Sequence, residues 1–441
     1  MKTKTMEREY FIEKNQEGKY LFVPFECPKN VWRMEISYSY KRFVKQETNQ
    51  GIVNQEVNIV DLGLHDEKNA FRGASGSNKT EIFIEENTST PGYISGIIHP
   101  GTWRLMFGAY KVEEVGCIVK FKIVFHFKER LLLRGDLHMH TQISDGDYSP
   151  RELINLAHMM KLDYIFLTDH NNFHQNDFIV PNEPLAVLPG MELTLYNGHC
   201  NLLGVKRPVT SFFANSKEEL KKTLLEARKN GALISINHPY DDCPWLFGFD
   251  LPFDLLEIQN SFYEEHIDRQ TINFWQERLV KGCRLPIVGG SDNHRIAFMQ
   301  SLGTPTTCLY AQSRGKSDIL MAVRNGHAFV SMFLDGPVVA LEMNGFIMGD
   351  IVPKEKITTL SITIQSLKRQ DEIKVIANTG EIFSKINDSG VNETQFTIEP
   401  NDATFYRVEI WRFVAPNVKI LGAITNPIYI GEDYWRKQEN D

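Results

Sequence analysis

In the segment RGDLHMHTQISDG, which begins at Arg134, two histidines are separated by a single residue. Alternate residues of a β-strand point to the same face, so a strand here would present His138 and His140 together on one side. Leu137 and Met139 would face the other side and pack in an apolar core. Two imidazoles on one face of a strand are suited to form one half of a metal site.

A turn and a helix are predicted directly after this strand. Asp145 lies in a Ser-Asp-Gly turn, where its carboxylate can fold back over the strand end. Ser149 and Glu152 then form a capping box, with Pro150 at the first helical position. The segment therefore reads as a strand, a turn that carries a ligand, and a helix.

Further ligand-type residues follow four more predicted strands, at 164–167, 187–188, 233–236 and 286–288. They are His170, Glu192, His199, His238, Asp292 and His294. Because the carboxyl ends of barrel strands converge, we expect these side chains to meet at one edge. A single histidine in such a place is more often structural, but the same placement at five strand ends is hard to obtain by chance.

The types of these residues indicate a metal cluster. Six histidines and three carboxylates suit zinc, manganese or iron, and no cysteine is placed to join them. Nine candidate ligands exceed what one tetrahedral ion needs. We therefore expect two or three divalent metal ions (Zn, Mn or Fe).

The rest of the chain must position this centre. Residues 1–130 show short strand-like runs and are predicted to form an N-terminal β-sandwich-like domain. Residues 131–333 alternate strands with helices, and residues 334–441 return to a β-rich pattern. Repeated β-α units without a Gly-x-Gly-x-x-Gly turn favour an α/β barrel over a dinucleotide-binding sheet.

Composition bounds the environment and the partners. The formal net charge of -8 argues against nucleic acid as a partner beyond a mono- or oligonucleotide substrate. The six cysteines are widely separated and form no disulfide framework, which suits a reducing compartment. No apolar leader and no membrane-spanning run is found, so we expect a cytoplasmic protein with a small-molecule substrate and no membrane partner. The oligomeric state is left open.

The motifs DLHMHT, SDG, TDHNN, PGMELT, NHP and GSDNH, in this order, resemble the PHP (polymerase and histidinol phosphatase) superfamily of metal-dependent phosphoesterases. The resemblance covers residues 131 to about 333, and the flanks resemble larger members such as carbamate hydrolases. It implies a distorted (β/α)7 TIM-like barrel with flanking β-sandwich-like domains and a trinuclear site. Carried over, His138, His140, Glu192 and Asp292 would hold one ion, Asp145, His170 and His294 a second, and Glu192, His199 and His238 a third.

The expected reaction is hydrolysis, in which a metal-bridging hydroxide attacks the phosphorus of a small phosphorylated substrate. Glu192 and Asp292 would act in catalysis by holding the ions. Arg295, directly after the last ligand, would steady a substrate oxyanion; a surface salt bridge is the alternative. Asp136 is expected to orient a ligand imidazole.

Two other readings stay open. The same hydroxide could attack the carbonyl of a carbamate, amide or ester, because both transition states are oxyanions beside metal ions. Converging Arg, Lys or backbone N–H groups would favour phosphate, and an apolar slot would favour an aryl ester or amide. A non-catalytic module with this fold is the other alternative, although such a module would be expected to lose its ligands first.

Overall fold

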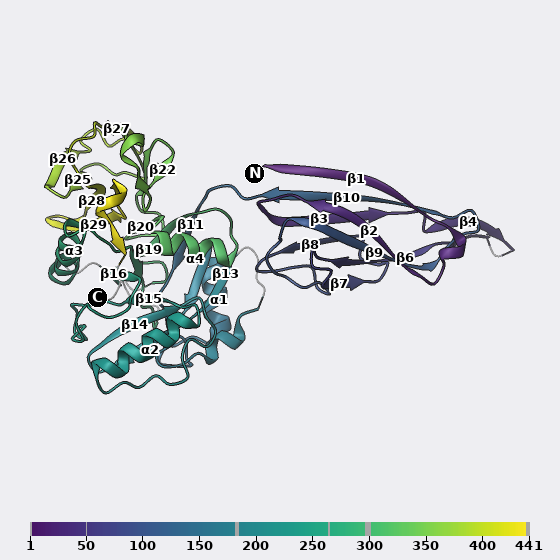
Figure 1. The fold of residues 1–441 in the computed structure, drawn as a ribbon, viewed down its shortest axis with the longest axis horizontal. Helices are drawn as coiled ribbons and strands as arrows, with labels where there is room; N and C mark the ends of the chain where they lie inside the picture. The colour runs from purple at the N-terminus through teal and green to yellow at the C-terminus, as the bar shows by residue number, and fades with distance from the viewer. Residues whose placement is uncertain (1, 50, 181–184, 263–264, 296–300, 438–441) are drawn as a thin grey trace. The chain divides into compact units, whose positions relative to one another are not determined.

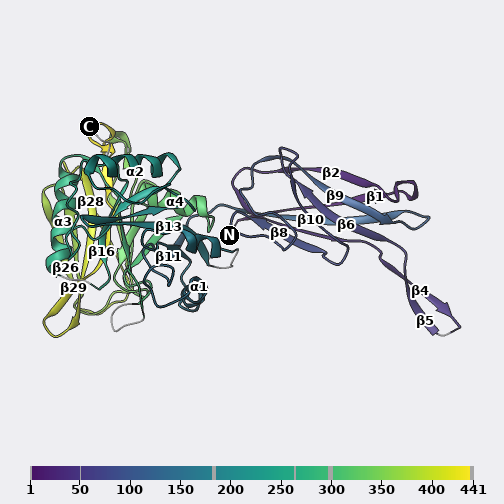
Figure 2. The same ribbon diagram turned by 90° about the horizontal axis from the view of Figure 1, so that it is seen from below.

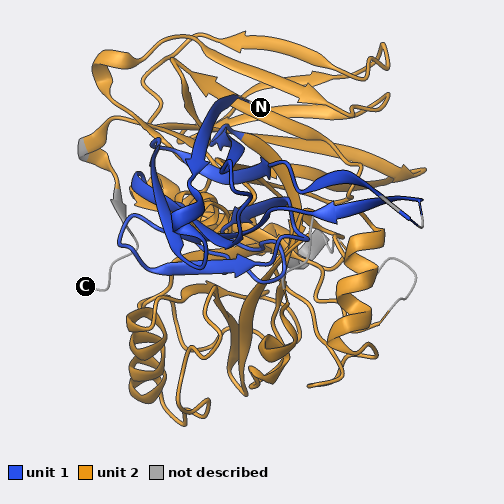
Figure 3. Ribbon diagram, turned by 90° about the vertical axis from the view of Figure 1, so that its right-hand side faces the viewer, with its two compact units in different colours: residues 1–130, 181–183 blue, residues 131–180, 184–441 orange. Residues whose placement is uncertain are grey.

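The computed structural model describes residues 2–49, 51–180, 185–262, 265–295 and 301–437. The chain divides into two compact units, one formed by Met1–Arg130 and the second by Leu131–Val180 and Pro184–Asp441 (Figure 3). Among the described residues, no helix combines the length and the apolar composition needed to cross a bilayer.

The first unit is built from two four-stranded antiparallel sheets, ordered β1-β10-β3-β8 and β2-β9-β6-β7, together with the hairpin β4–β5 (Figures 1 and 2). Val119, Phe121 and Ile123 are buried, while Lys120 and Lys122 between them are exposed, as expected for a strand with one face in a core. The strands are β1 (Thr3–Ile12), β2 (Tyr20–Cys27), β3 (Val31–Ser39), β4 (Phe43–Thr48), β5 (Gly51–Glu56), β6 (Ile59–His65), β7 (Phe71–Ser75), β8 (Glu81–Glu85), β9 (Gly101–Lys111) and β10 (Cys117–Phe127), with a 3-10 turn at Lys14–Gln16.

The second unit begins with the strands and helices that carry the predicted ligands. In chain order they are β11 (Leu131–Asp136), α1 (Pro150–Met159), β12 (Tyr164–Leu167), a 3-10 turn at His174–Phe178, β13 (Ala186–Leu195), β14 (Gly198–Leu203), α2 (Lys217–Lys229), β15 (Leu233–Ile236), β16 (Leu255–Asn260), α3 (Glu265–Val280), β17 (Cys283–Arg284), β18 (Ile287–Gly290), β19 (Thr306–Ala311), α4 (Lys316–Asn325) and β20 (Ala328–Ser331).

The remaining strands of the second unit carry none of these ligands. They are β21 (Val338–Met343), β22 (Phe346–Ile347), β23 (Ile351–Val352), β24 (Leu360–Gln365), β25 (Glu372–Ala377), β26 (Gly380–Ile386), β27 (Thr394–Ile398), β28 (Phe405–Ala415), β29 (Val418–Thr425), β30 (Ile428–Ile430) and β31 (Arg436–Lys437), with 3-10 turns at Lys354–Lys356 and Glu432–Tyr434. The predicted boundary between residues 333 and 334 stays a prediction.

A mixed sheet runs through the second unit in the order β18-β16-β15-β14-β13-β12-β11-β19-β20-β29-β28-β25-β26. The structure does not show the TIM-like barrel that the sequence resemblance implies. Strand β14 returns antiparallel from β13 as a hairpin, and β19 pairs antiparallel with β11 and β20. Strands joined by hairpins have no crossover helix between them, so helices are fewer than regular β-α alternation would require.

Strands β11 and β18, six places apart in this order, are brought together at their carboxyl ends. Met139 and Asn293 form a parallel bridge just beyond the two strands. The amide of Asp292 donates to the His138 carbonyl over 2.9 Å, and the amide of His140 donates to the Asn293 carbonyl over 2.9 Å. The segments that follow the two strands therefore run side by side.

The ends of the helices follow local sequence signals. Ser149 caps α1 in the predicted capping box with Glu152, and Ser216 caps α2. The N-cap residue of helix α4 is Gly315. This helix ends at Gly326, whose φ of +70° suits glycine.

Candidate metal centre

His138 and His140 follow strand β11 rather than lie within it. The strand ends at Asp136, so the prediction that both imidazoles stand on the strand itself is wrong. Beyond the end of β11, an isolated β-bridge between Met139 and Asn293 continues the pairing of the two segments. The rings of His138 and His140 still lie near each other, with centroids 5.2 Å apart. Both histidines are fully buried.

The carboxylate of Glu192, on β13, lies among five imidazoles and is itself fully buried. Its Oε2 atom is 2.7 Å from His170 Nδ1 and 3.5 Å from His140 Nε2. Its Oε1 atom is 3.3 Å from His138 Nε2, 3.3 Å from His199 Nδ1 and 3.6 Å from His238 Nε2. One carboxylate therefore contacts five histidines that come from four separate segments of the chain.

Asp292, in the segment after β18, contacts His138 and His140. Its Oδ1 atom is 2.9 Å from His140 Nε2 and 3.3 Å from His138 Nε2. The backbone at Asp292 has a φ of +50° and that at His238 a φ of +26°. Positive φ is costly for residues with a side chain, and such strain gathers at functional sites.

Gly290 makes the close approach of the β18 and β11 segments possible. A Cβ atom at Gly290 would lie 2.3 Å from His138 Cβ and 2.9 Å from Glu257 Oε1. The second glycine of the GGSDNH segment is therefore needed for space beside His138 rather than for its backbone angles.

Asp145 and two histidines form the exposed side of the cluster. His294 Nε2 is 3.3 Å from Asp145 Oδ1, and His170 Nε2 is 3.6 Å from Asp145 Oδ2. The His140 ring stacks on both His170 and His294, with centroids 4.1 Å apart in each case. The Asp145 side chain is 56% exposed, so this side of the centre is open to solvent.

Among the described residues, the side chains form three groups whose ligand atoms lie close enough to hold an ion: His140, Asp145, His170 and His294; His138, His140 and Asp292; and His138, Glu192 and His238. These groups bring together every predicted ligand except His199, which contacts Glu192 but belongs to none of them. His140 was expected to hold the first ion only. In the structure it belongs to two groups, one with His138 and Asp292 and the other with Asp145, His170 and His294. Arg295 is exposed, and its contact with substrate stays a prediction.

The donor set fits divalent metal ions. His138 Nε2 is buried, lies 3.3 Å from both Glu192 Oε1 and Asp292 Oδ1, and lacks a hydrogen-bond partner among the described residues. A buried polar atom without a partner destabilises the fold because it has lost its hydrogen bonds to water. A metal ion that accepts the lone pair of such a nitrogen would replace those hydrogen bonds. Neutral imidazole and carboxylate are also the protonation states that bind zinc, manganese or iron.

Glu192 and His140 favour the protonation states that bind a metal ion. Burial raises the pKa of Glu192, but the charge of His138 and the contacts with His170 and His199 outweigh it and hold the pKa well below its usual range. Burial lowers the pKa of His140 below its ordinary value, which keeps that imidazole neutral. In His138, three carboxylates outweigh burial and raise the pKa, so an ion that binds this ring would displace a proton.

Asp136 was predicted to orient a ligand imidazole, but in the structure its carboxylate binds backbone amides instead. Its carboxylate accepts hydrogen bonds from the backbone amides of His138, Ser291 and Gly303, over 3.2, 3.0 and 2.8 Å. The side chain points back into the protein and ties the β11 and β18 segments together. It supports the backbone of the centre rather than a ring.

Two carboxylates contact candidate ligand rings from behind: Asp241, whose Oδ2 atom lies 2.9 Å from His238 Nδ1, and Glu257, on β16, and sequence reasoning missed both. The Oε1 atom of Glu257 lies 3.0 Å from His138 Nδ1. A signal was present in the sequence, because Glu257 stands between Leu256 and Ile258 in an otherwise apolar strand. An acidic residue inside a buried strand requires a partner.

A cavity of about 230 Å³ adjoins the centre on the side of His238. Its described lining is acidic and polar, and consists of His238, Asp241, Asp242, Glu257, Ile258, Asn260, Ser261, Phe262, Asp268 and Thr271. No Lys or Arg is among these described lining residues.

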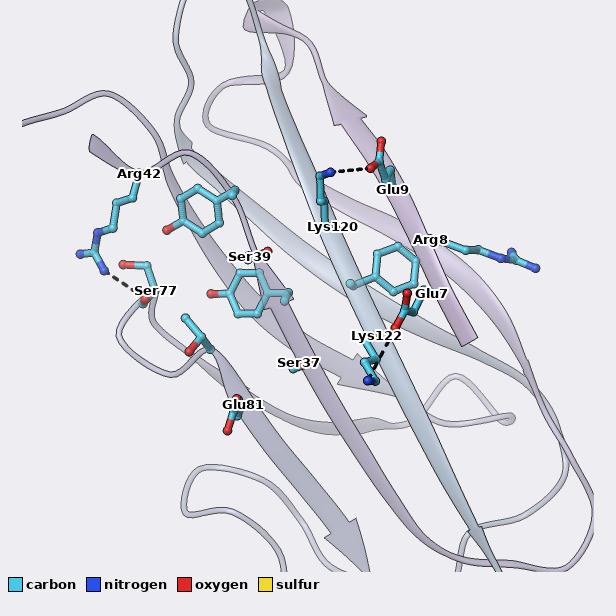
Figure 4. Close-up of a pocket in the computed structure, with 14 residues that line it drawn as sticks. Glu7, Arg8, Glu9, Ser37, Ser39, Arg42, Ser77, Glu81, Lys120 and Lys122 are labelled. Carbon is cyan, nitrogen blue, oxygen red and sulfur yellow. Dashed lines mark hydrogen bonds and ion pairs between the residues drawn. The ribbon is translucent and has the colours of Figure 1, made fainter. Parts of the chain in front are cut away.

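A larger hollow of about 730 Å³ belongs to the first unit and contains none of the predicted ligands (Figure 4). Its surface carries the pairs Glu9–Lys120, at 2.9 Å, and Glu7–Lys122, at 3.6 Å. These side chains are at least half exposed, and surface ion pairs of this kind contribute little energy. The hollow therefore does not share the chemistry of the metal-ligand cluster.

Residues 136–286 match the family model of the PHP domain. The matched range includes every predicted ligand up to His238, while Asp292 and His294 follow it. No curated protein matches the chain.

Among solved structures, the chain is similar to a two-domain protein from Bacteroides vulgatus that contains a predicted PHP-like metal-dependent phosphoesterase, with 18% identity, a TM-score of 0.37, and coverage of 68% of this chain and 96% of that one. It is also similar to a protein from Bifidobacterium adolescentis named as a metal-dependent phosphoesterase, with 14% identity, a TM-score of 0.27, and coverage of 38% and 90%. An amidohydrolase from Chromobacterium violaceum shows 13% identity, a TM-score of 0.26, and coverage of 36% and 87%.

The family assignment rests on the match over residues 136–286. Histidines and carboxylates of this range come together in the ligand groups of the structure. The protein contains a PHP domain at residues 136–286.

Proposed function

We propose that the second unit is a metal-dependent hydrolase acting on a small phosphorylated molecule. The observation that carries this proposal is the convergence of one buried carboxylate, Glu192, with five imidazoles, while His138 Nε2 lacks a hydrogen-bond partner among the described residues. The PHP domain over residues 136–286 supports it.

Two or three divalent ions of zinc, manganese or iron would be held by the three groups, with His199 as a further ligand through its contact with Glu192. When bound, such ions activate water as a nucleophile and offset negative charge that develops on an attacked phosphoryl or carbonyl group.

The residues of the chain prepare the site for this chemistry. The lowered pKa of Glu192 keeps it ionised without contact with water. Thr194 Oγ1 lies 2.6 Å from His170 Nδ1, and the Asp292 carbonyl oxygen lies 2.8 Å from His294 Nδ1. Each of these two rings is therefore held in place through its own Nδ1 atom. Fixed rings direct the opposite nitrogen, Nε2, toward Asp145. Arg295, exposed beside the centre, would meet a substrate oxyanion there.

We also infer that the strands from β11 to β18 close into a distorted barrel. The bridge between Met139 and Asn293 supports this closure. Thr307 on β19 adds to it, because its hydroxyl donates to the Gly289 carbonyl over 2.7 Å and accepts from the Gly289 amide over 2.8 Å.

A specific observation favours carbamate, amide or ester hydrolysis as the second candidate. The cavity beside His238 is lined by Asp241, Asp242 and Asp268, and by no Lys or Arg among its described residues. The carboxylate of Asp242 would repel a phosphate dianion, and no described Lys or Arg of the cavity would offset that charge. A neutral carbonyl substrate meets no such repulsion.

The test is hydrolysis by protein stripped of metal and reloaded with Mn²⁺, Zn²⁺ or Fe²⁺. The substrates are phosphomonoesters, phosphodiesters, and mono- and oligonucleotides, and the Glu192→Ala variant is the control. Metal-dependent phosphate release that this substitution abolishes would support the phosphoesterase. Release from aryl carbamates or amides alone would support the second candidate, and no turnover of either class with metal bound would favour a non-catalytic module.

A further inference from the structure

Glu257 is a buried carboxylate that belongs to none of the three ligand groups. Its residue is 2% exposed, and its neighbours on β16, Leu256 and Ile258, pack in the core. A carboxylate buried this deeply is retained only where charged or hydrogen-bonding partners compensate for the loss of water. Its partners therefore indicate what it does.

The first oxygen of Glu257 fixes the ring of His138. Oε1 lies 3.0 Å from His138 Nδ1, where it accepts the proton carried by that nitrogen. His138 Nε2 is then left with its lone pair, 3.3 Å from Glu192 Oε1 and 3.3 Å from Asp292 Oδ1. A carboxylate behind a histidine is the arrangement that sets both the tautomer and the direction of a metal-binding ring.

The second oxygen fixes the backbone of His238. Oε2 accepts a hydrogen bond from the His238 amide over 3.0 Å and another from Asn260 Nδ2 over 3.1 Å. His238 has a φ of +26°, a conformation that a residue with a side chain adopts only when its surroundings hold it. Its ring then reaches to 3.6 Å from Glu192.

We propose that Glu257 is a positioning residue that holds His138 and His238 in their binding arrangement and so sets the affinity of the centre for metal. This proposal rests on the metal-dependent function proposed above. Because His138 belongs to two of the three groups, a shift of its ring weakens both. Glu257 acts through the two histidines and is not itself among the grouped ligands.

The experiment compares metal binding by the wild type, Glu257→Gln and Glu257→Asp. Each full-length protein is stripped with a chelator and titrated with Zn²⁺ and with Mn²⁺ in a calorimeter, and bound metal is counted by elemental analysis. The amide of Glu257→Gln keeps the shape but loses the charge that favours a proton on Nδ1. Glu257→Asp keeps the charge but withdraws it by one methylene. We expect both to weaken metal binding by about 10–100-fold, as loss of a partner behind a ligand does.

The matched control is Glu409→Gln, a second buried carboxylate of the same unit. Glu409 is 7% exposed and is paired with Arg407 and Trp411, and it belongs to none of the described ligand groups. We expect this variant to lose stability but to bind metal with wild-type affinity. The unfolding midpoint of each metal-free protein identifies a variant that does not fold. If Glu257→Gln does not fold, the metal affinity of Glu257→Asp tests the proposal.

The proposal is overturned if the folded Glu257 variants bind metal as tightly as the wild type, or if Glu409→Gln weakens binding equally. It is also overturned if the wild type binds neither ion. Since the readout is affinity, a wild type that binds metal but hydrolyses nothing would refute the proposed hydrolase and leave this test intact.

Discussion

The Oε2 atom of Glu192 lies 2.7 Å from the Nδ1 atom of His170. The two residues also form a parallel β-bridge, and the amide of Asn171 donates to the Glu192 carbonyl over 2.8 Å. The carboxylate and the imidazole are therefore brought together by their backbones rather than by flexible side chains alone. Backbone and side-chain contacts of this centre can therefore be tested separately.

Replacing Glu192 by Gln should reduce the number of bound ions and the affinity for those that remain. The amide keeps the volume but removes the charge shared by five imidazoles. We expect affinity to fall by at least the roughly 10–100-fold that loss of a supporting residue costs. Calorimetric titration and elemental analysis of the reloaded protein measure both quantities. Unchanged metal content would show that Glu192 is not a ligand.

Replacing Asp145 by Asn should remove one ion and leave the fold intact. The side chain is 56% exposed, so we expect the metal-free protein to keep its stability within about 0.5 kcal/mol. The group of His140, His170 and His294 would lose its carboxylate. Asp147→Asn, also at an exposed position, is the matched control. Equal metal content in the two variants would contradict the assignment.

Replacing Gly290 by Ala should damage both stability and metal binding. The added Cβ atom would lie 2.3 Å from His138 Cβ, so one of the two segments must move. Overpacking of this kind costs about 1–3 kcal/mol. Urea unfolding and metal titration check the two effects. Gly76→Ala, where the nearest heavy atom is 3.4 Å away, should change neither, and a Gly290→Ala variant with wild-type binding would refute the argument.

Replacing Ser149 by Ala should destabilise helix α1 without altering the affinity for metal. The hydroxyl of Ser149 accepts a hydrogen bond from the amide of Glu152 over 3.3 Å. Loss of such a cap costs about 1 kcal/mol, which denaturant unfolding resolves. Ser216→Ala removes the equivalent cap of α2 and should cost a similar amount. If metal affinity falls in step with stability, the centre and the helix start are coupled after all.

The stability contributed by Glu409 should depend on pH. Burial raises the pKa of Glu409, but the charge and hydrogen bond of Arg407 outweigh it and lower the pKa below its ordinary value of 4.5. A carboxyl whose pKa is lower in the folded state stabilises the protein above the unfolded-state pKa and loses this effect as the pH falls through the folded-state value.

The comparison for this prediction is urea unfolding of the wild type and Glu409→Gln. The difference between their free energies of unfolding should be largest near neutral pH and should shrink steadily below about pH 4.5. A difference that stays constant down to about pH 2 would show that Glu409 does not stabilise the fold through its charge.

Local signals predicted more of this protein than global ones. The capping box at Ser149 follows from interactions within a few residues, and it is as predicted. The convergence of the ligand motifs could be foreseen because strand ends gather at one edge. The sheet order could not, because a hairpin such as β13–β14 replaces a crossover through pairing that depends on distant strands.

Polar residues behind the ligands were the hardest to assign. Asp136 lies beside His138 in sequence and was expected to hold an imidazole, yet it binds backbone amides. The carboxylate on the His138 ring is Glu257, more than a hundred residues away. Sequence proximity does not identify a partner when the contact is made across a sheet.

The side-by-side course of the segments after β11 and β18 also constrains how this protein folds. His140 and Asp292, which meet at 2.9 Å, are separated by 152 residues. Closing so large a loop is entropically costly, and contacts of this separation form late in folding. The metal-ligand cluster can therefore assemble only when the strands between these residues are in place. A nascent chain that has not yet emerged as far as Asp292 lacks this pair, so the group of His138, His140 and Asp292 can form only after β18 has been made.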